Sequence, residues 1–155
     1  MKKLVVMITM LLVLVGCGGS ASSQSNAKEQ VVYTKETASG ISTKYEIGYD
    51  GDTIVDVKRT YEATIVASMF ERNTLEELEQ LYTVQYIDPE KEVDGIEHDI
   101  KISEEDKKLT VISDINVEKA KDIQLPTVFE ITTLDTMKNL EKELVGLGFT
   151  VEKDK

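Results

Sequence analysis

Hydrophobic side chains in residues 31–65 recur at every second position, which is the spacing of β-strands. This spacing predicts strands over Val31–Thr37 and Val55–Ile65, although Arg59 interrupts the apolar face of the second. A third strand lies between them, and its alternating positions are Ile41, Thr43, Tyr45, Ile47 and Tyr49. Asp50-Gly51 follows it as a hairpin signal, because both central residues of a type I′ turn need positive φ. We therefore expect an antiparallel meander of three strands.

From residue 73 the apolar spacing changes to three and four, the period of an α-helix. The positions that carry this period are Leu75, Leu78, Leu81, Tyr82 and Tyr86. Asn73 is the expected N-cap, with Glu76 in the capping-box position three residues later. Pro89 predicts that the helix ends, kinks or restarts near Asp88.

Alternation returns after Gly95 and predicts a second antiparallel pair. Its strands cover Ile96–Ile102 and Leu109–Val117, and Glu104–Lys108 forms the turn. A short apolar run over Val128–Thr132 adds an optional last strand.

A second helix is predicted over Leu134–Val145, with Gly146 or Gly148 near its end. Its inward positions are Met137, Leu140 and Leu144. The element order is βββ-α-ββ(β)-α. This order predicts an α+β fold in which two helices pack on one face of an antiparallel sheet.

The first sixteen residues form a separate segment with the pattern of an export leader. Lys2 and Lys3 precede the uncharged run Leu4–Val15, which would rise about 18 Å as a helix and is too short to span a hydrocarbon core of about 30 Å. Leu14-Val15-Gly16-Cys17 matches a lipobox around the only cysteine of the chain. We predict cleavage before Cys17 and acylation of its thiol, for example with palmitate, which anchors the protein to a membrane.

Three parts of the chain follow from this pattern: a leader over residues 1–16, a lipidated Cys17 with a flexible tether over residues 17–29, and one domain over residues 30–155. The tether is predicted from its Gly, Ser, Gln and Asn content. Removing the leader leaves no other cysteine, so no disulfide is expected. The location expected is the extracytoplasmic face of a cell membrane. Lys, Glu and Ile usage with Cys17-Gly18-Gly19 is typical of a low-GC Gram-positive source.

Acidic residues dominate the part that remains after cleavage. The whole chain has 18 basic and 29 acidic residues, so losing Lys2 and Lys3 leaves 16 against 29 and moves the formal charge from -11 to -13. This charge disfavours nucleic acid and anionic lipid headgroups as partners. It is compatible with cationic partners and equally with a role in solubility. The oligomeric state is left open.

Three residues are candidates for a ligand surface: Tyr45, Tyr49 and His98. The tyrosines share a strand face and could line a groove, or they could pack in the core between sheet and helix. His98 is the only histidine and could be a base or ligand, or a strand histidine satisfied by a hydrogen bond. Asp50-Gly51-Asp52 resembles the start of a calcium loop, but the residues after it favour a turn.

No catalytic residues, metal site or cofactor are predicted, because the sequence lacks nucleophile-elbow, phosphate-loop and dinucleotide motifs. Zinc is disfavoured by one histidine and no available thiol. The membrane, through the lipid on Cys17, is the one partner that the sequence predicts directly.

Four features of the chain resemble the YehR-like bacterial lipoproteins: the lipobox, the hairpin Tyr49-Asp50-Gly51-Asp52 with its following strand, the turn Lys107-Lys108-Leu109-Thr110, and the closing Leu140–Phe149 stretch that ends Gly-Leu-Gly-Phe. The resemblance covers nearly the whole chain. It implies a small α+β domain in a family of uncharacterised lipoproteins, and it brings no catalytic or binding residues.

The leading functional hypothesis is a non-enzymatic surface module at the cell envelope that binds a peptide, a protein or a small molecule. It predicts an exposed apolar or tyrosine-lined surface. An alternative is a small envelope hydrolase that uses carboxylates or His98. A further alternative is that the freed leader stretch Thr9–Gly16 acts as a secreted signalling peptide.

Overall fold

The computed structural model describes residues 27–91, 93–120 and 124–152. The predicted leader, Cys17 and most of the tether lie outside the described residues. Six strands form one sheet: β1 (Glu29–Glu36), β2 (Ser42–Asp50), β3 (Thr53–Thr64), β4 (Ile96–Ser103), β5 (Lys108–Asn116) and β6 (Thr150–Val151). Their order across the sheet is β4-β5-β3-β2-β1-β6, and all the paired neighbours are antiparallel.

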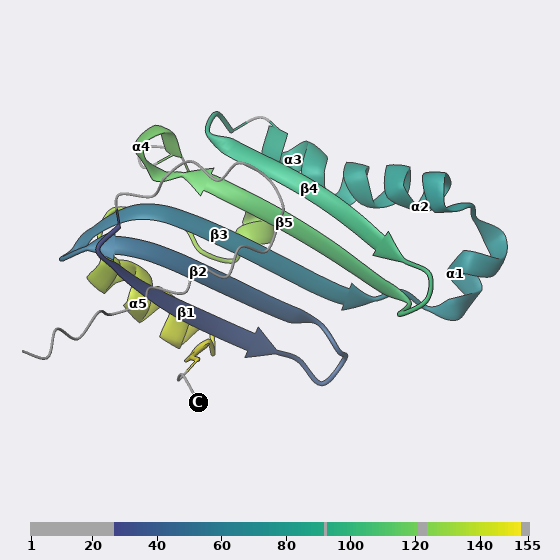
Figure 1. The fold of residues 1–155 in the computed structure, drawn as a ribbon, viewed down its shortest axis with the longest axis horizontal. Helices are drawn as coiled ribbons and strands as arrows, with labels where there is room; N and C mark the ends of the chain where they lie inside the picture. Colours follow the sequence, from purple (N-terminus) through teal and green to yellow (C-terminus); the bar gives the residue numbers. More distant parts are fainter. Residues whose placement is uncertain (1–26, 92, 121–123, 153–155) are drawn as a thin grey trace, which may run out of the picture.

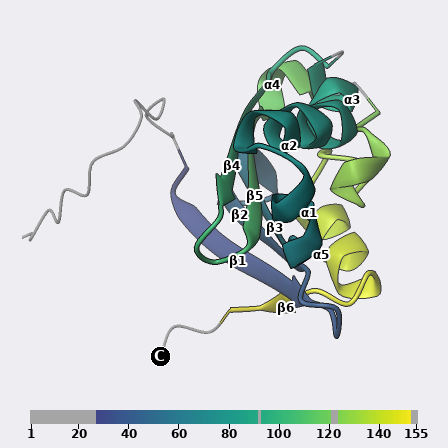
Figure 2. The same ribbon diagram turned by 90° about the vertical axis from the view of Figure 1, so that its right-hand side faces the viewer.

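The helical segments lie on one face of this sheet, as Figure 2 shows. The α1–α3 cover comprises α1 (Ala67–Arg72), α2 (Leu75–Tyr82), the π-helix η1 (Thr83–Ile87) and α3 (Asp88–Lys91). The C-terminal cover comprises α4 (Val117–Ala120), the 3-10 helix η2 (Thr127–Phe129) and α5 (Met137–Gly146). The predicted α+β class, with helices on one face of an antiparallel sheet, is confirmed. None of the described helices is long and apolar enough to cross a membrane.

Two apolar clusters fill the space between sheet and covers. The larger lies under the C-terminal cover and includes Tyr45, Phe129, Leu140 and Phe149. The smaller lies under the α1–α3 cover, and its buried members are Ile65, Ile87, Leu109 and Val111. Figure 1 shows the two covers behind opposite parts of the sheet, with α5 behind β1–β3 and α2 beside β4.

Several predicted element boundaries differ from the structure for local reasons. Thr74 is the N-cap of α2 and forms the capping box with Glu77, one residue beyond the predicted pair Asn73 and Glu76. Asn73 instead donates a side-chain hydrogen bond to the carbonyl of Met69 at 2.8 Å, where α1 ends. Because two helices meet here, adjacent polar residues cap different helices.

Two further predictions are corrected or refined in the second half of the chain. Val128–Thr132 is not a strand, since Pro126 precedes the 3-10 helix η2 and Glu130 after it has a φ of 63°. Two helices were predicted, whereas the described residues form five α-helical segments. The π-helix η1 lies before Pro89, so the helix restarts as α3, in line with the predicted kink.

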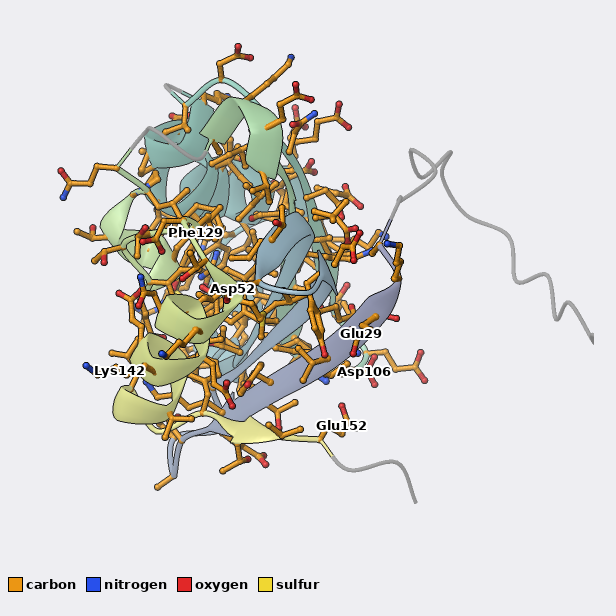
Figure 3. The ribbon with its side chains drawn as sticks, turned by 90° about the vertical axis from the view of Figure 1, so that its left-hand side faces the viewer. Glu29, Asp52, Asp106, Phe129, Lys142 and Glu152 are labelled. Atoms are coloured by element: carbon orange, nitrogen blue, oxygen red, sulfur yellow. The ribbon has the colours of Figure 1, made fainter. Side chains whose placement is uncertain are left out.

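The β2–β3 hairpin holds the N-terminus of α5. The main-chain N–H of Met137 donates to the carbonyl of Asp52 at 2.9 Å, and that of Lys138 donates to its Oδ1 at 2.9 Å. Figure 3 shows Asp52 beside α5. Gly51 supplies the expected positive φ of 63°, so Asp50-Gly51-Asp52 is a turn that caps a helix.

We expect Asp52→Ala to lower the free energy of unfolding by about 1 kcal/mol, because the substitution removes a carboxylate cap from α5. Asp50→Ala is the matched control. Asp50 forms only an exposed ion pair with Lys28 at 2.8 Å, and such pairs contribute between about 0 and 1 kcal/mol. Urea denaturation of both variants measures the difference. Equal losses would show that the Asp52 carboxylate does not cap α5.

Candidate interaction surface

The strand register places a row of polar and aromatic side chains across the covered face of the sheet. The members of this cross-sheet row are directly opposite one another on successive strands: Tyr33, Tyr45, Arg59, Ser113 and His98. Arg59 and Ser113 are buried. The Arg59 guanidinium lies 5.3 Å from the centre of the Tyr61 ring and 5.0 Å from that of Phe129. These two rings cover a cation that would otherwise be costly to bury.

Tyr45 does not line a groove, because its side chain is fully buried. Its hydroxyl donates to the carbonyl of Phe129, and its ring meets that of Phe149 edge-on at 5.5 Å. Tyr45 therefore packs in the core between sheet and helix, which is the second of the two interpretations that the sequence allowed. Its assignment to a ligand surface is corrected, since η2 and the residues after α5 cover this part of the strand face.

Tyr49 is partly exposed and its hydroxyl donates to Glu29 at 3.3 Å. Burial and the nearby Glu29 raise the pKa of Tyr49. The strand register shifts between Gly48 and Tyr49, and Tyr49 packs against the rim of the larger apolar cluster. Strands β5 and β3 separate Tyr49 on β2 from His98 on the edge strand β4.

His98 lies on the covered face of β4, as its parity predicts. It is partly buried, and its Nδ1 has no hydrogen-bond partner among the described residues. Burial lowers the pKa of His98 and Lys91 lowers it further, whereas Asp88 acts in the opposite direction. Ser113 is directly opposite His98 but fully buried, so this pair offers no accessible nucleophile for the hydrolase interpretation.

A shallow hollow lies on the uncovered face of the sheet. Its lining is polar throughout and comprises Thr34, Ser42, Lys44, Thr60, Glu62 and Glu152. Glu62 also pairs with Lys108 at 3.4 Å. No group of three or more metal-ligating side chains comes together in the part of the chain that the structure describes.

Three tyrosines come together between the sheet and the α1–α3 cover: Tyr61 on β3, Tyr82 at the end of α2 and Tyr86 in the π-helix η1. In this tyrosine cluster, the Tyr61 and Tyr86 rings lie 5.0 Å apart with their hydroxyls at 3.2 Å, and the Tyr82 ring lies 6.3 Å from that of Tyr86. All three side chains are partly exposed. Burial raises the pKa of Tyr61 and of Tyr82, so both phenols stay neutral in the physiological range.

Exposed apolar side chains gather on the same part of the chain. Of the six large hydrophobic residues that are exposed in the described ranges, four fall between residues 66 and 84: Val66 (63%), Leu75 (47%), Leu81 (47%) and Val84 (60%). Met69, Phe70 and Tyr82 in this stretch and Tyr86 just after it are partly exposed. We call these eight residues the α1–η1 surface. The smaller apolar cluster beneath the α1–α3 cover has four buried members and seven partly buried ones. Most of its side chains are therefore only partly shielded from solvent.

The predicted helical stripe explains part of this surface. Within α2 only Leu78 is buried, whereas Leu75 and Leu81 lie on either side of it. Leu81 and Val84 are three residues apart and therefore neighbours on the helix surface. The sequence placed Leu75 and Leu81 in the apolar stripe with Leu78, but the structure leaves both exposed.

Comparison with known proteins identifies the fold. No family model and no curated protein matches the sequence. The structure is similar to that of Escherichia coli YehR, solved by NMR, with a TM-score of 0.64 and 17% identity over 84% of this chain and 95% of YehR. It is also similar to the NMR structure of a Streptococcus pneumoniae protein, with a TM-score of 0.54 and 12% identity over 95% of this chain and 99% of the other. The chain therefore has a YehR-like fold.

Proposed function

We propose that the chain is a YehR-like lipoprotein, anchored through lipid on Cys17 to the extracytoplasmic face of a cell membrane, and that it acts as a non-enzymatic interaction module. The lipobox around Cys17 supports the anchor. The observation that carries the interaction role is the concentration of exposed apolar side chains between Val66 and Val84, because exposed apolar patches mark interaction sites.

The position of this surface suits an anchored module. The chain enters the sheet at Glu29, beside the β2–β3 hairpin. β3 starts at this hairpin and has twelve residues, so it carries the chain roughly 40 Å before α1 begins. The α1 end of the surface thus lies at the far end of the sheet from the tether, where an extracellular partner can reach it.

Site-specific photocrosslinking in intact cells tests the interaction role. A photoreactive phenylalanine analogue replaces Leu81 in one variant and Val145 in a matched control. Val145 is 58% exposed but lies on α5, away from the α1–η1 surface. We expect a defined adduct from position 81 and none from position 145. The absence of an adduct at 81, or the same adduct at both positions, would contradict an interaction module that uses this surface.

A further inference from the structure

The imidazole of His98 lies on the face of β4 that the α1–α3 cover packs against, and its Nδ1 is a buried polar atom. This nitrogen has no hydrogen-bond partner among the described residues. A neutral imidazole carries a hydrogen on one nitrogen, whereas an imidazolium is a donor at both. Protonation of His98 would therefore leave a charged N–H buried without an acceptor, which disfavours the closed structure.

The charges around His98 also oppose its protonation. From α3, Lys91 disfavours the charged imidazole and Asp88 favours it. These two side chains form the α3 ion pair, at 2.8 Å, so the described carboxylate that favours a charged His98 is already paired with a cation. Across the sheet, β5 presents the neutral, fully buried Ser113, and the buried Arg59 on β3 lies beyond it in the same row.

The other elements at this part of the sheet bring no opposite charge to His98. The end of α2 and η1 contribute the phenols of Tyr82 and Tyr86 to the smaller apolar cluster. On β4 itself, Glu97 and Asp99 alternate with His98 and point to the uncovered face. On the helical side, the α3 ion pair is therefore the charged group that acts on His98.

The α1–α3 cover is the part of the domain that can respond to a charge on His98. Among its described side chains, Leu78 and Ile87 are buried, and α1 has no buried residue. In the C-terminal cover, α5 alone buries Met137, Leu140 and Leu144. Because segments with few buried apolar contacts open at a lower free energy, the α1–α3 cover should open before the C-terminal cover does.

We propose that protonation of His98 opens the α1–α3 cover, so that the domain exposes its smaller apolar cluster in mildly acidic surroundings. This device goes beyond the proposed function and depends on neither the lipid anchor nor a partner. Burial, together with Lys91, holds the pKa of His98 below its ordinary value of 6.5 in the closed structure, and opening returns the pKa towards that value. The open form therefore binds more protons, and the closed form loses stability as the pH falls through 6.5.

Hydrogen–deuterium exchange of the full chain in detergent micelles measures this opening. His98 is the only histidine, so it is the one side chain whose ordinary pKa lies between about pH 5 and 8. We expect the protection factors of amides in α1, α2 and η1 to fall at least about threefold between about pH 7.5 and 5.5, since one unit of pKa difference corresponds to a tenfold change in the opening equilibrium. Amides of α5 should keep their protection.

Two variants assign this response to His98. In His98→Gln, the protection of the cover should no longer depend on pH in this range. Lys91→Gln should raise the pKa of His98, because it removes the cation of the α3 ion pair, whereas Lys142→Gln on the exposed side of α5 should leave that pKa unchanged. The single imidazole signal in NMR spectra of the full chain reports the pKa, and circular dichroism checks that the variants are folded.

Three results of the exchange experiment would overturn the inference: protection of the cover that does not change with pH, the same pH dependence in His98→Gln, or an equal change in α5. A pKa of His98 at or above its ordinary value in the wild-type chain would overturn it as well, and this measurement does not require His98→Gln to fold. The crosslinking experiment at position 81 tests the proposed function separately, so the two can fail independently.

Discussion

Phe129→Ala is expected to lower the free energy of unfolding by about 3–5 kcal/mol, because it leaves a cavity at the centre of the molecule. The Phe129 ring is fully buried, lies on the helical side of the sheet (Figure 3), and covers the Arg59 guanidinium at 5.0 Å. Its loss removes apolar contacts and one of the two aromatic rings that lie over the Arg59 guanidinium. Since a domain of this size has a total stability of about 5–15 kcal/mol, this loss removes a large share of the stability of the domain.

Urea denaturation followed by circular dichroism measures this loss, and Val128→Ala is the matched control. Val128 is adjacent in sequence but only partly buried. Its truncation removes fewer buried methyl groups, so we expect a loss of about 1 kcal/mol. A similar loss of unfolding free energy in the two variants would mean that Phe129 contributes no more to the core than the partly buried Val128.

Cys17→Ser is expected to move the protein from the membrane fraction to the medium. Each buried methylene of an acyl chain contributes about 0.8 kcal/mol, and two chains are needed for stable anchoring. Serine has no thiol to acylate, and none of the described helices can replace the anchor. Fractionation of cells followed by immunoblotting measures the distribution.

The released variant should keep its fold, because residue 17 precedes the first described residue by ten positions. Near-ultraviolet circular dichroism of the secreted protein tests this point. Lys28→Ala is a control for changes near the tether and should stay in the membrane fraction. A Cys17→Ser variant that also stays in the membrane pellet would refute lipid anchoring.

Alternation and helical periodicity predicted most of the fold because these patterns record which face of an element is buried. Strands β2 and β5 have uninterrupted alternation, so both were predicted correctly. The sequence did not reveal the helix Ala67–Arg72, which has no buried residue and so leaves no periodic pattern. Residues 128–132 were predicted as a short strand, whereas Phe129 ends the 3-10 helix η2 and Ile131 follows in a loop, and both side chains insert into the core.

The candidate surface was harder to predict, because the pattern along a strand does not say what covers it. Tyr45 and Tyr61 have the same parity and face the same side of the sheet. Phe129 and Phe149 cover Tyr45 completely, whereas the π-helix covers Tyr61 only in part. This difference depends on contacts between residues 25 to 104 positions apart in the chain, which local sequence patterns do not report.

The pairing of β6 with β1 has a consequence for how the chain folds. Thr150 is opposite Thr34, so the sheet joins residues near both ends of the domain, and α5 is capped by a hairpin that is made 86 residues earlier. Contacts of this range slow folding, because the entropy of loop closure must be lost before they form. The domain cannot complete its fold until the last residues have left the ribosome. For a protein exported as proposed here, this delay keeps the chain unfolded while it crosses the membrane during secretion.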